Sequence, residues 1–276
     1  MTTVFPLPSP VLPEFSTLVL KGPYHASAPI HLCLTHVANR PGTKAVLLTP
    51  SRDNFIAALR DLNDDWLNEC GGYGSVSQAL SRVDVFYPPT PAHASLALSM
   101  LRVSRPEIAP SSLEIASPCL VLLHEISSYF LDGNNSGLHT LASYLSLVAH
   151  ALSTLRSLSE QVSGSHVSLV LMDSRLDSLS LPVLQPSVQA PDVDLGGQSE
   201  PSFRVAFLIH HYFEWVGTFE FKETPPQMES FTHFLRLRET ARGDDDEADV
   251  IMQWRQIDGQ PRVFNNNRTG VVFVFQ

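Results

Sequence analysis

Short apolar runs divide the chain before Asp173 into units that alternate between strand and helix patterns. Most runs contain consecutive Val, Leu or Ile residues, a pattern typical of strands that a parallel sheet buries on both faces. The segments between them are long enough for helical crossovers, which parallel strands require and which are right-handed. This order predicts an α/β fold with a mainly parallel central sheet flanked by helices. The runs lie at 18–22, 45–49, 83–87, 119–125 and 167–173.

Apolar residues at helical spacing occupy the segments between these runs. The clearest helix is expected at 138–161, where leucines and valines spaced by three and four residues share one face. Another is expected at 54–69, after an N-cap at Ser51 or Asp53. Its expected buried stripe is Phe55, Leu59, Leu62 and Trp66. The remaining helices are expected at 30–38 and 93–101.

The pattern changes after Asp173. Residues 174–202 are rich in Ser, Pro, Gln, Asp and Gly and predict a long polar loop. Beyond the loop we expect strands without long helices between them, hence antiparallel strands at the edge of the parallel sheet. The pair Asp258-Gly259 is typical of a tight hairpin turn, which would return the chain to a strand at 262–264. The other expected strands lie at 203–209, 231–237, 249–256 and 271–275.

The first fifteen residues form a segment of their own. Prolines at positions 6, 8, 10 and 13 predict an extended arm, because proline fixes φ and removes an N–H donor. The arm is either a frayed terminus or a docking arm, since Phe5 and Phe15 are unusual residues to leave in water. We therefore divide the chain into an arm at 1–15 and a single domain at 16–276 with a flexible loop at about 174–202.

Composition excludes several classes of protein. With 43% hydrophobic residues among 276, the chain can bury a real core. Three widely separated cysteines make neither a disulfide framework nor a paired-cysteine zinc site, and no apolar run is long enough to span a membrane. We expect a reducing intracellular compartment, nuclear or cytoplasmic, and no secretion. A net charge of −10 argues against nucleic-acid binding by the whole surface but allows a local basic patch.

The turn after the first strand stands where a nucleotide-binding fold places its phosphate loop. Such a loop needs the pattern G-x-x-x-x-G-K-[ST]. Gly22 is present, but the second Gly, the Lys and the hydroxyl residue have no counterparts, and Pro23 and Pro29 remove two N–H donors. The chain has only three lysines, none at the required position: Lys21, Lys44 and Lys222. Nucleotide hydrolysis is therefore not expected, and the chain is predicted not to be an enzyme.

The other motifs in the sequence are weak evidence for metal binding or catalysis. Glu125 lies at the tip of an apolar strand, where an acidic residue can hold magnesium through water, although a charged strand end alone is a weak signal. His124-Glu125 does not begin a metalloprotease H-E-x-x-H motif, because the fifth position is Ser128. No nucleophile elbow and no metal-ligand spacing of His residues is present. We predict no catalytic residue, no metal and no cofactor.

Arginine carries most of the positive charge, and its guanidinium makes bidentate contacts to phosphate. Strand alternation places Arg236 and Arg238 on one face, opposite Leu235 and Leu237. This face is either a solvated edge strand or a surface that contacts nucleic acid or a partner protein. The candidate contact residues are Arg175, Arg236, Arg238, Arg242 and Arg262.

Several strings resemble the RecA-like core of eukaryotic recombinase paralogs. The stretch 22–36 looks like a decayed phosphate loop with its helix, and 45–55 resembles the second strand of that family. The stretch 119–130 looks like the Walker B strand, and 249–262 is similar to the terminal hairpin. The resemblance covers roughly 16–275 and implies a RecA-like fold, with a degenerate nucleotide site at Gly22, His31 and Glu125.

The same resemblance implies a role in an assembly. Members of this superfamily without ATPase activity serve as subunits, such as the Shu-type recombination mediators and the RecA-like subunits of the Elongator tRNA-modification complex. The terminal hairpin favours the first group. This implies a partner with a RecA-like fold and, through the complex, contact with single-stranded or forked DNA. The family's DNA-facing loop corresponds to 174–200, where Arg175 is outnumbered by acidic residues.

Overall fold

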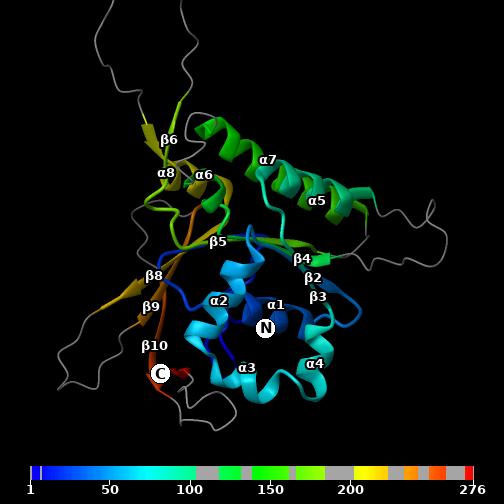
Figure 1. Ribbon diagram of the computed structural model, residues 1–276, viewed down its shortest axis with the longest axis vertical. Coiled ribbons are helices and arrows are strands. Elements are labelled where there is room, and N and C mark those ends of the chain that lie inside the picture. Colours follow the sequence, from blue (N-terminus) through cyan, green and yellow to red (C-terminus); the bar gives the residue numbers. More distant parts are fainter. Residues whose placement is uncertain are drawn as a thin grey trace, which may run out of the picture.

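The computed structural model describes residues 2–6, 8–103, 118–131, 139–161, 166–183, 202–222, 233–241, 249–258 and 271–275. Within these residues, one large sheet crosses the molecule, with helices on both of its faces (Figure 1). Its strand order is β11-β10-β9-β8-β1-β5-β4-β2-β3. None of the described helices combines the length and apolar character that crossing a bilayer requires.

Parallel strands form the half of the sheet that the apolar runs predict. They pair in parallel in the order β1, β5, β4, β2 and β3, and every residue of β4 and β5 is buried. Burial on both faces explains why these runs are continuously apolar. The strands are β1 (Thr17–Lys21), β2 (Lys44–Leu48), β3 (Val83–Phe86), β4 (Pro118–His124) and β5 (Ser168–Asp173).

The other half of the sheet is mainly antiparallel, as expected. β8 (Trp215–Phe221) runs parallel to β1, and the strands beyond it alternate in direction. They are β9 (His233–Glu239), β10 (Val250–Asp258) and β11 (Val271–Phe275). The predicted architecture is therefore confirmed: a mainly parallel sheet, flanked by helices, with antiparallel C-terminal strands. A separate small pair consists of β6 (Ser180–Pro182) and β7 (Ser202–Arg204).

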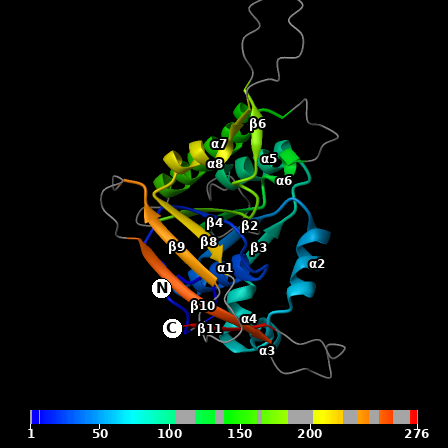
Figure 2. The same ribbon diagram turned by 90° about the vertical axis from the view of Figure 1, so that its left-hand side faces the viewer.

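Two helical layers enclose the sheet (Figures 1 and 2). One layer consists of α1 (Ala28–Ala38), α2 (Arg52–Leu62), α3 (Asp65–Cys70) and α4 (Gly74–Leu80). The other consists of α5 (Pro91–Val103), α6 (Ser128–Leu131), α7 (Leu141–Gln161) and α8 (Val205–Ile209), followed by the short 3₁₀ turn η2 (His210–Tyr212). Each layer packs its own hydrophobic cluster against the sheet.

The single helix predicted at 54–69 is wrong, because the structure has two helices there. Asn63 adopts a left-handed conformation with φ of 35° and ends α2. The Asp64 carboxylate then accepts the Leu67 N–H at 3.1 Å and caps α3. Leu62, expected in the buried stripe, is 42% exposed. A residue that tolerates the left-handed region and a capping carboxylate together break the helix.

Two further predictions after the polar loop need correction. The strand expected at 203–209 is mostly helix α8, in which Val205, Ala206 and Ile209 are buried at helical spacing. Strand β8 was not expected, because its alternation of polar and apolar residues includes Gly217. A Cβ at this position would lie 2.4 Å from the Leu20 Cδ2 atom of β1, so the glycine lets leucine side chains pack over the strand.

The hairpin predicted at Asp258-Gly259 has a different partner strand. β10 pairs with β9 on one side and with β11 on the other, and Asp258 lies opposite Val271. The expected return strand at 262–264 lies outside the described residues.

The proline-rich arm packs on the body of its own chain. Phe5 is 3% exposed, and its ring centroid lies 4.8 Å from Trp254 and 4.6 Å from Phe273. The Thr3 N–H donates to the Thr35 hydroxyl of α1 at 3.0 Å, and the Thr3 carbonyl accepts from the same hydroxyl at 2.9 Å. In the described residues the arm is thus a docked segment that joins α1 to the C-terminal strands.

Candidate functional site

Polar side chains gather at the carboxyl ends of β1, β4 and β5, the edge at which parallel α/β sheets bind ligands. Glu125 follows β4, Asp173 ends β5, and Tyr24 follows β1. Beside them lies a pocket of about 290 Å³. Its lining includes Tyr24, Thr49, Ser51, Asn54, His124, Glu125, Ser128, Ser174 and Arg175.

Glu125 is held in place by the chain around it. Its backbone has φ of 51°, and its N–H donates to the Met172 carbonyl at 2.8 Å. Its carboxylate accepts hydrogen bonds from the Tyr24 hydroxyl and, at 2.9 Å, from the Ser174 N–H. Burial, together with the Glu125 charge, raises the pKa of Tyr24, so the phenol remains a donor. The carboxylate is therefore engaged by its own chain.

Asp173 is completely buried and fully hydrogen bonded. It accepts from the Ser127 N–H at 2.7 Å, the Ser127 hydroxyl at 2.6 Å and the Arg175 N–H at 3.1 Å. Burial raises the pKa of Asp173 to about 7, the neighbouring Glu125 charge adds to this rise, and the hydrogen bonds oppose it. Asp173 thus ties the loop after β4 to the end of β5.

The N-terminus of α1 should supply free N–H groups if this loop binds phosphate. Its first amides are used within the chain instead. The Ala28 N–H donates to the His25 carbonyl at 2.9 Å. The Ile30 and His31 N–H groups donate to the Ser27 carbonyl at 2.9 and 3.0 Å. Residue 29 is proline and has no N–H, so this end of the helix offers no row of donors to an anion.

A buried polar cluster fills the same position: His25, Ser27, His31 and Asp64. Asp64 accepts from the Ser27 hydroxyl at 2.5 Å and from His31 Nε2 at 2.7 Å. His25 contacts Ser27 at 2.8 Å, and Phe273 of β11 packs edge-on against His25 with 5.0 Å between ring centroids. Burial acts to raise the pKa of Asp64, but the hydrogen bonds from His31 and Ser27 outweigh it and lower the pKa.

Gly22 has a structural task at the end of β1. Its φ is +91°, and a Cβ there would lie 2.3 Å from the Phe219 carbonyl oxygen of β8. The glycine therefore permits the close approach of two strands. This close approach accounts for the glycine without any phosphate.

The three residues assigned to the degenerate nucleotide site have different contacts in the structure. Gly22 faces β8, the His31 side chain lies in the buried cluster, and Glu125 meets Tyr24. Sequence reasoning missed Tyr24, Asp64 and the role of Asp173. The position of Asp173 at the end of an apolar strand could have indicated that it belongs to the site. Asp64 gave no signal, because it fell inside a predicted helix.

The predicted alternation in β9 is confirmed: Arg236 and Arg238 are exposed, whereas Leu235 and Leu237 are buried. The expected edge position is wrong, because β9 lies between β8 and β10, but the face that carries both arginines is exposed to solvent, as that alternative expected. Arg236 forms ion pairs of 3.7 Å with Glu220 and with Asp249.

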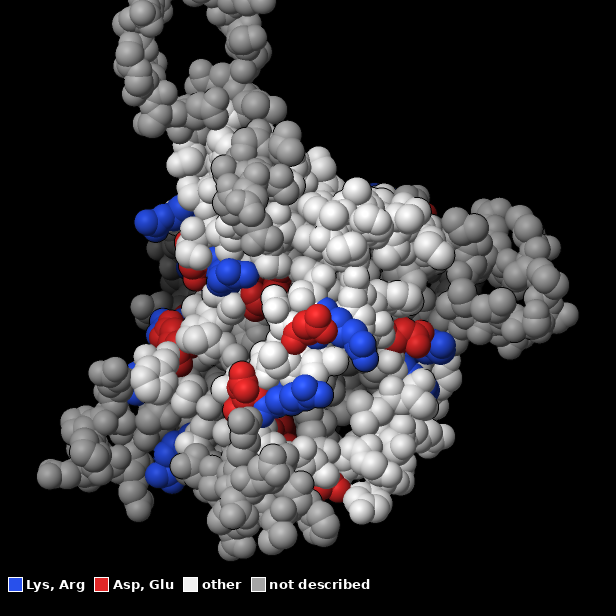
Figure 3. All heavy atoms as spheres, viewed as in Figure 1, with Lys and Arg blue, Asp and Glu red and all other residues white. Residues whose placement is uncertain are grey.

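The other arginine candidates are scattered. Arg175 is exposed and lines the pocket beside Glu125, whereas Arg242 and Arg262 lie outside the described residues. On the face shown in Figure 3, basic and acidic side chains are interspersed around α2 and the antiparallel strands. The area over α5 and α7 carries few charges in the same view.

The residues present at the nucleotide position do not fit a nucleoside triphosphate with magnesium. The loop lacks a lysine, the helix amides are used internally, and the Asp64 carboxylate would repel a phosphate. Among the described residues, no three His, Cys, Asp or Glu side chains gather as a metal site would require.

No protein-family model matches the chain. No curated protein matches it either. Among solved structures, the chain is similar to a crystal structure of the RadB recombinase, with a TM-score of 0.46 and 13% sequence identity. The match covers 87% of this chain and 88% of that one.

Proposed function

We propose that this protein is a non-catalytic, RecA-like assembly subunit that acts in homologous-recombination DNA repair by pairing with another RecA-like chain. One observation carries the non-catalytic part of the proposal. At the N-terminus of α1, where phosphates would bind, lies the buried cluster of His25, Ser27, His31 and Asp64, against which Phe273 of β11 packs. The recombination part rests on the family resemblance of the sequence.

Electrostatics supports the loss of nucleotide binding. An anion at a helix N-terminus is stabilised by free N–H groups and by the helix dipole. Here a buried carboxylate occupies that environment, and burying a second negative charge beside it is strongly unfavourable. Opening the site would also separate Asp64 from the Ser27 and His31 donors. We therefore expect no measurable binding of ATP with magnesium.

Surface features support a partner protein. Leu96 and Met100 lie one turn apart on α5 and are 58% and 64% exposed. They belong to the layer that carries few charges in Figure 3. An exposed apolar pair on a weakly charged surface is typical of a protein interface. The net charge of −10 favours DNA contact through a complex over binding by this chain alone.

Nucleotide titration and turnover test the first half of the proposal. We expect no heat of binding with ATP and magnesium, no turnover, and no difference for Glu125→Gln. ATP turnover that disappears in Glu125→Gln would show an active hydrolase and reject the proposal.

Affinity purification of the full chain tests the second half. A recombinase-type RecA-like chain should co-purify, and its recovery should fall at least tenfold with Leu96→Asp combined with Met100→Asp. Arg60→Glu, an exposed change on α2 in the opposite layer, is the matched control. Recovery of Elongator subunits would replace the recombination role with the tRNA-modification alternative. A chain that stays monomeric with every RecA-like candidate would reject pairing.

A further inference from the structure

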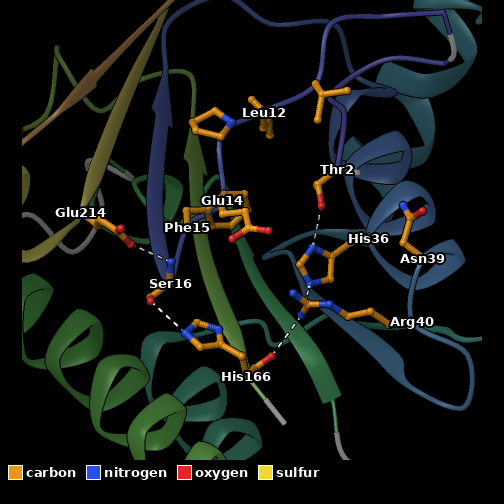
Figure 4. Close-up of a pocket in the computed structure, with 12 residues that line it drawn as sticks. Thr2, Leu12, Glu14, Phe15, Ser16, His36, Asn39, Arg40, His166 and Glu214 are labelled. Atoms are coloured by element: carbon orange, nitrogen blue, oxygen red, sulfur yellow. Dashed lines mark hydrogen bonds between the residues drawn. The ribbon is translucent and has the colours of Figure 1, made fainter. Parts of the chain in front are cut away.

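A second cavity lies at the amino ends of the central strands, opposite the edge that carries Glu125 and Asp173. Its volume is about 700 Å³, within the range of about 300–1,000 Å³ that ligand pockets occupy. The arm forms one wall, the C-terminal half of α1 forms another, and His166 before β5 closes the floor (Figure 4). None of the chemistry described above uses this cavity.

Arg40 brings a fixed positive charge to this cavity. Its Nη1 donates to His36 Nε2 at 2.9 Å and to the His166 carbonyl at 3.1 Å. Because Nε2 of His36 accepts this bond, it carries no proton. Burial, and then the Arg40 charge, lower the pKa of His36 to about 4, so the imidazole is neutral at physiological pH. The guanidinium is therefore anchored by neutral groups, and its charge is not cancelled there.

Glu14 brings a negative charge from the facing wall. Buried Leu12 and Phe15 fix the arm on either side of it, and its exposed carboxylate points into the cavity (Figure 4). Glu14 and Arg40 are both among the described residues, and no hydrogen bond or ion pair joins their side chains. Glu214 also lines the cavity with a negative charge, and one of its carboxylate oxygens accepts the Ser16 N–H at 2.7 Å. Opposite charges thus face each other across the cavity without meeting.

This arrangement is complementary to a ligand with opposite charges at its two ends. Leu12, Val11 and Pro13 of the arm add apolar lining between the charged groups. An ammonium group would meet the Glu14 carboxylate, and a carboxylate would meet the Arg40 guanidinium in the paired geometry that arginine favours. We propose that this cavity binds a short zwitterionic peptide, recognised by its free amino and carboxyl ends and by apolar side chains.

Three forms of one tripeptide of leucine and alanine test the proposal: free ends, an acetylated amino end, and an amidated carboxyl end. Titration of the full-length protein, followed by calorimetry, should show the free form binding at least tenfold more tightly than either blocked form. Glu14→Gln should remove the preference over the acetylated form alone. Arg40→Gln should remove the preference over the amidated form alone.

Two controls keep the result interpretable. Glu160→Gln, an exposed change on α7, should bind all three forms as the unaltered protein does. Thermal unfolding shows whether Arg40→Gln remains folded. If it does not, Arg40→Lys takes its place and should bind the free form within threefold of the unaltered protein. The loss of preference in Glu14→Gln then tests the proposal. No binding of the free form at millimolar concentration, or equal affinity for all three forms, overturns the proposal.

Discussion

Gly22 and Gly42 both adopt left-handed conformations, but only Gly22 also lies against another strand. Replacing each with alanine therefore distinguishes the cost of backbone strain from the cost of a steric clash. Gly22 has φ of +91° and a Cβ there would lie 2.3 Å from a carbonyl oxygen, whereas Gly42 has φ of +79° with nothing within 4 Å. We expect Gly42→Ala to lose about 1 kcal/mol of unfolding free energy from backbone strain alone. Gly22→Ala should lose roughly 3 kcal/mol or more, because β1 and β8 must also separate. Urea unfolding of both variants measures the difference, and equal losses would contradict the close approach.

His124 makes stability depend on pH through its burial. Its Nδ1 lies 3.0 Å from the Thr49 hydroxyl, and burial lowers its pKa to about 4, although the Glu125 charge opposes this. The unfolded chain binds the proton near the ordinary pKa of about 6.5, so it gains protons first as the pH falls. Stability is therefore complete above about pH 6.5 and is lost progressively down to about pH 4.

His124→Gln keeps a hydrogen-bonding side chain but removes this proton. Between about pH 4 and 6.5, the slope of unfolding free energy against pH should decrease by up to about 1.4 kcal/mol per pH unit. Urea unfolding at several pH values measures the slope, and the exposed His93, replaced in the same way, is the matched control. An unchanged slope in His124→Gln would show that the buried imidazole is not the group that titrates.

At the scale of elements, Asp64 joins α1 to α3, because its carboxylate accepts from Ser27 and His31 at the start of α1 and from the Leu67 N–H of α3. The preceding residue, Asn63, adds β11, because its carbonyl accepts the Val271 N–H at 2.8 Å. Asp64→Asn can place an amide N–H₂ group at the position toward which the Ser27 and His31 donors point. We expect a loss of about 2–4 kcal/mol, since donors to a buried charge are left without it.

Amide exchange distinguishes a local from a general effect of Asp64→Asn. The Val271 amide should exchange faster in the variant, because β11 rests on the α2–α3 junction. Asp53→Asn, in the exposed first turn of α2, should cost at most about 1 kcal/mol. A stability loss in Asp64→Asn no larger than in Asp53→Asn would show that the buried cluster does not hold these elements together.

Sequence patterns predicted elements well where burial alone decides them. The central residues of β4 and β5 are continuously apolar because both faces of these strands are covered. Patterns failed where one residue overrides them: Asn63 breaks a helical stripe, and Gly217 hides a strand. The candidate site was predicted only in part, because Tyr24 and Asp64 reach it from loops whose shape follows from tertiary packing.

At the scale of the whole molecule, the two ends of the chain pack together (Figure 2). Phe5 of the arm contacts Trp254 of β10 and Phe273 and Phe275 of β11. Phe5→Ala should lower the unfolding free energy by about 3–5 kcal/mol, because a buried ring is lost and a cavity remains. Urea unfolding followed by tryptophan fluorescence measures the loss.

Val11→Ala is the matched control for Phe5→Ala, since Val11 belongs to the same arm but is 40% exposed. It should cost less than about 1 kcal/mol. Limited proteolysis should cut the arm of Phe5→Ala well before that of Val11→Ala. Equal cleavage rates with a loss below about 1 kcal/mol in both variants would contradict a docked arm.

The docked arm also sets an order of events during synthesis. Phe5 leaves the ribosome long before β10 and β11, the strands on which its ring packs. Contacts between such distant segments form late, because the intervening loop must close first. A nascent chain stalled before β10 should therefore carry a Phe5 ring that is not yet packed, and translation of β10 and β11 should allow that ring to dock.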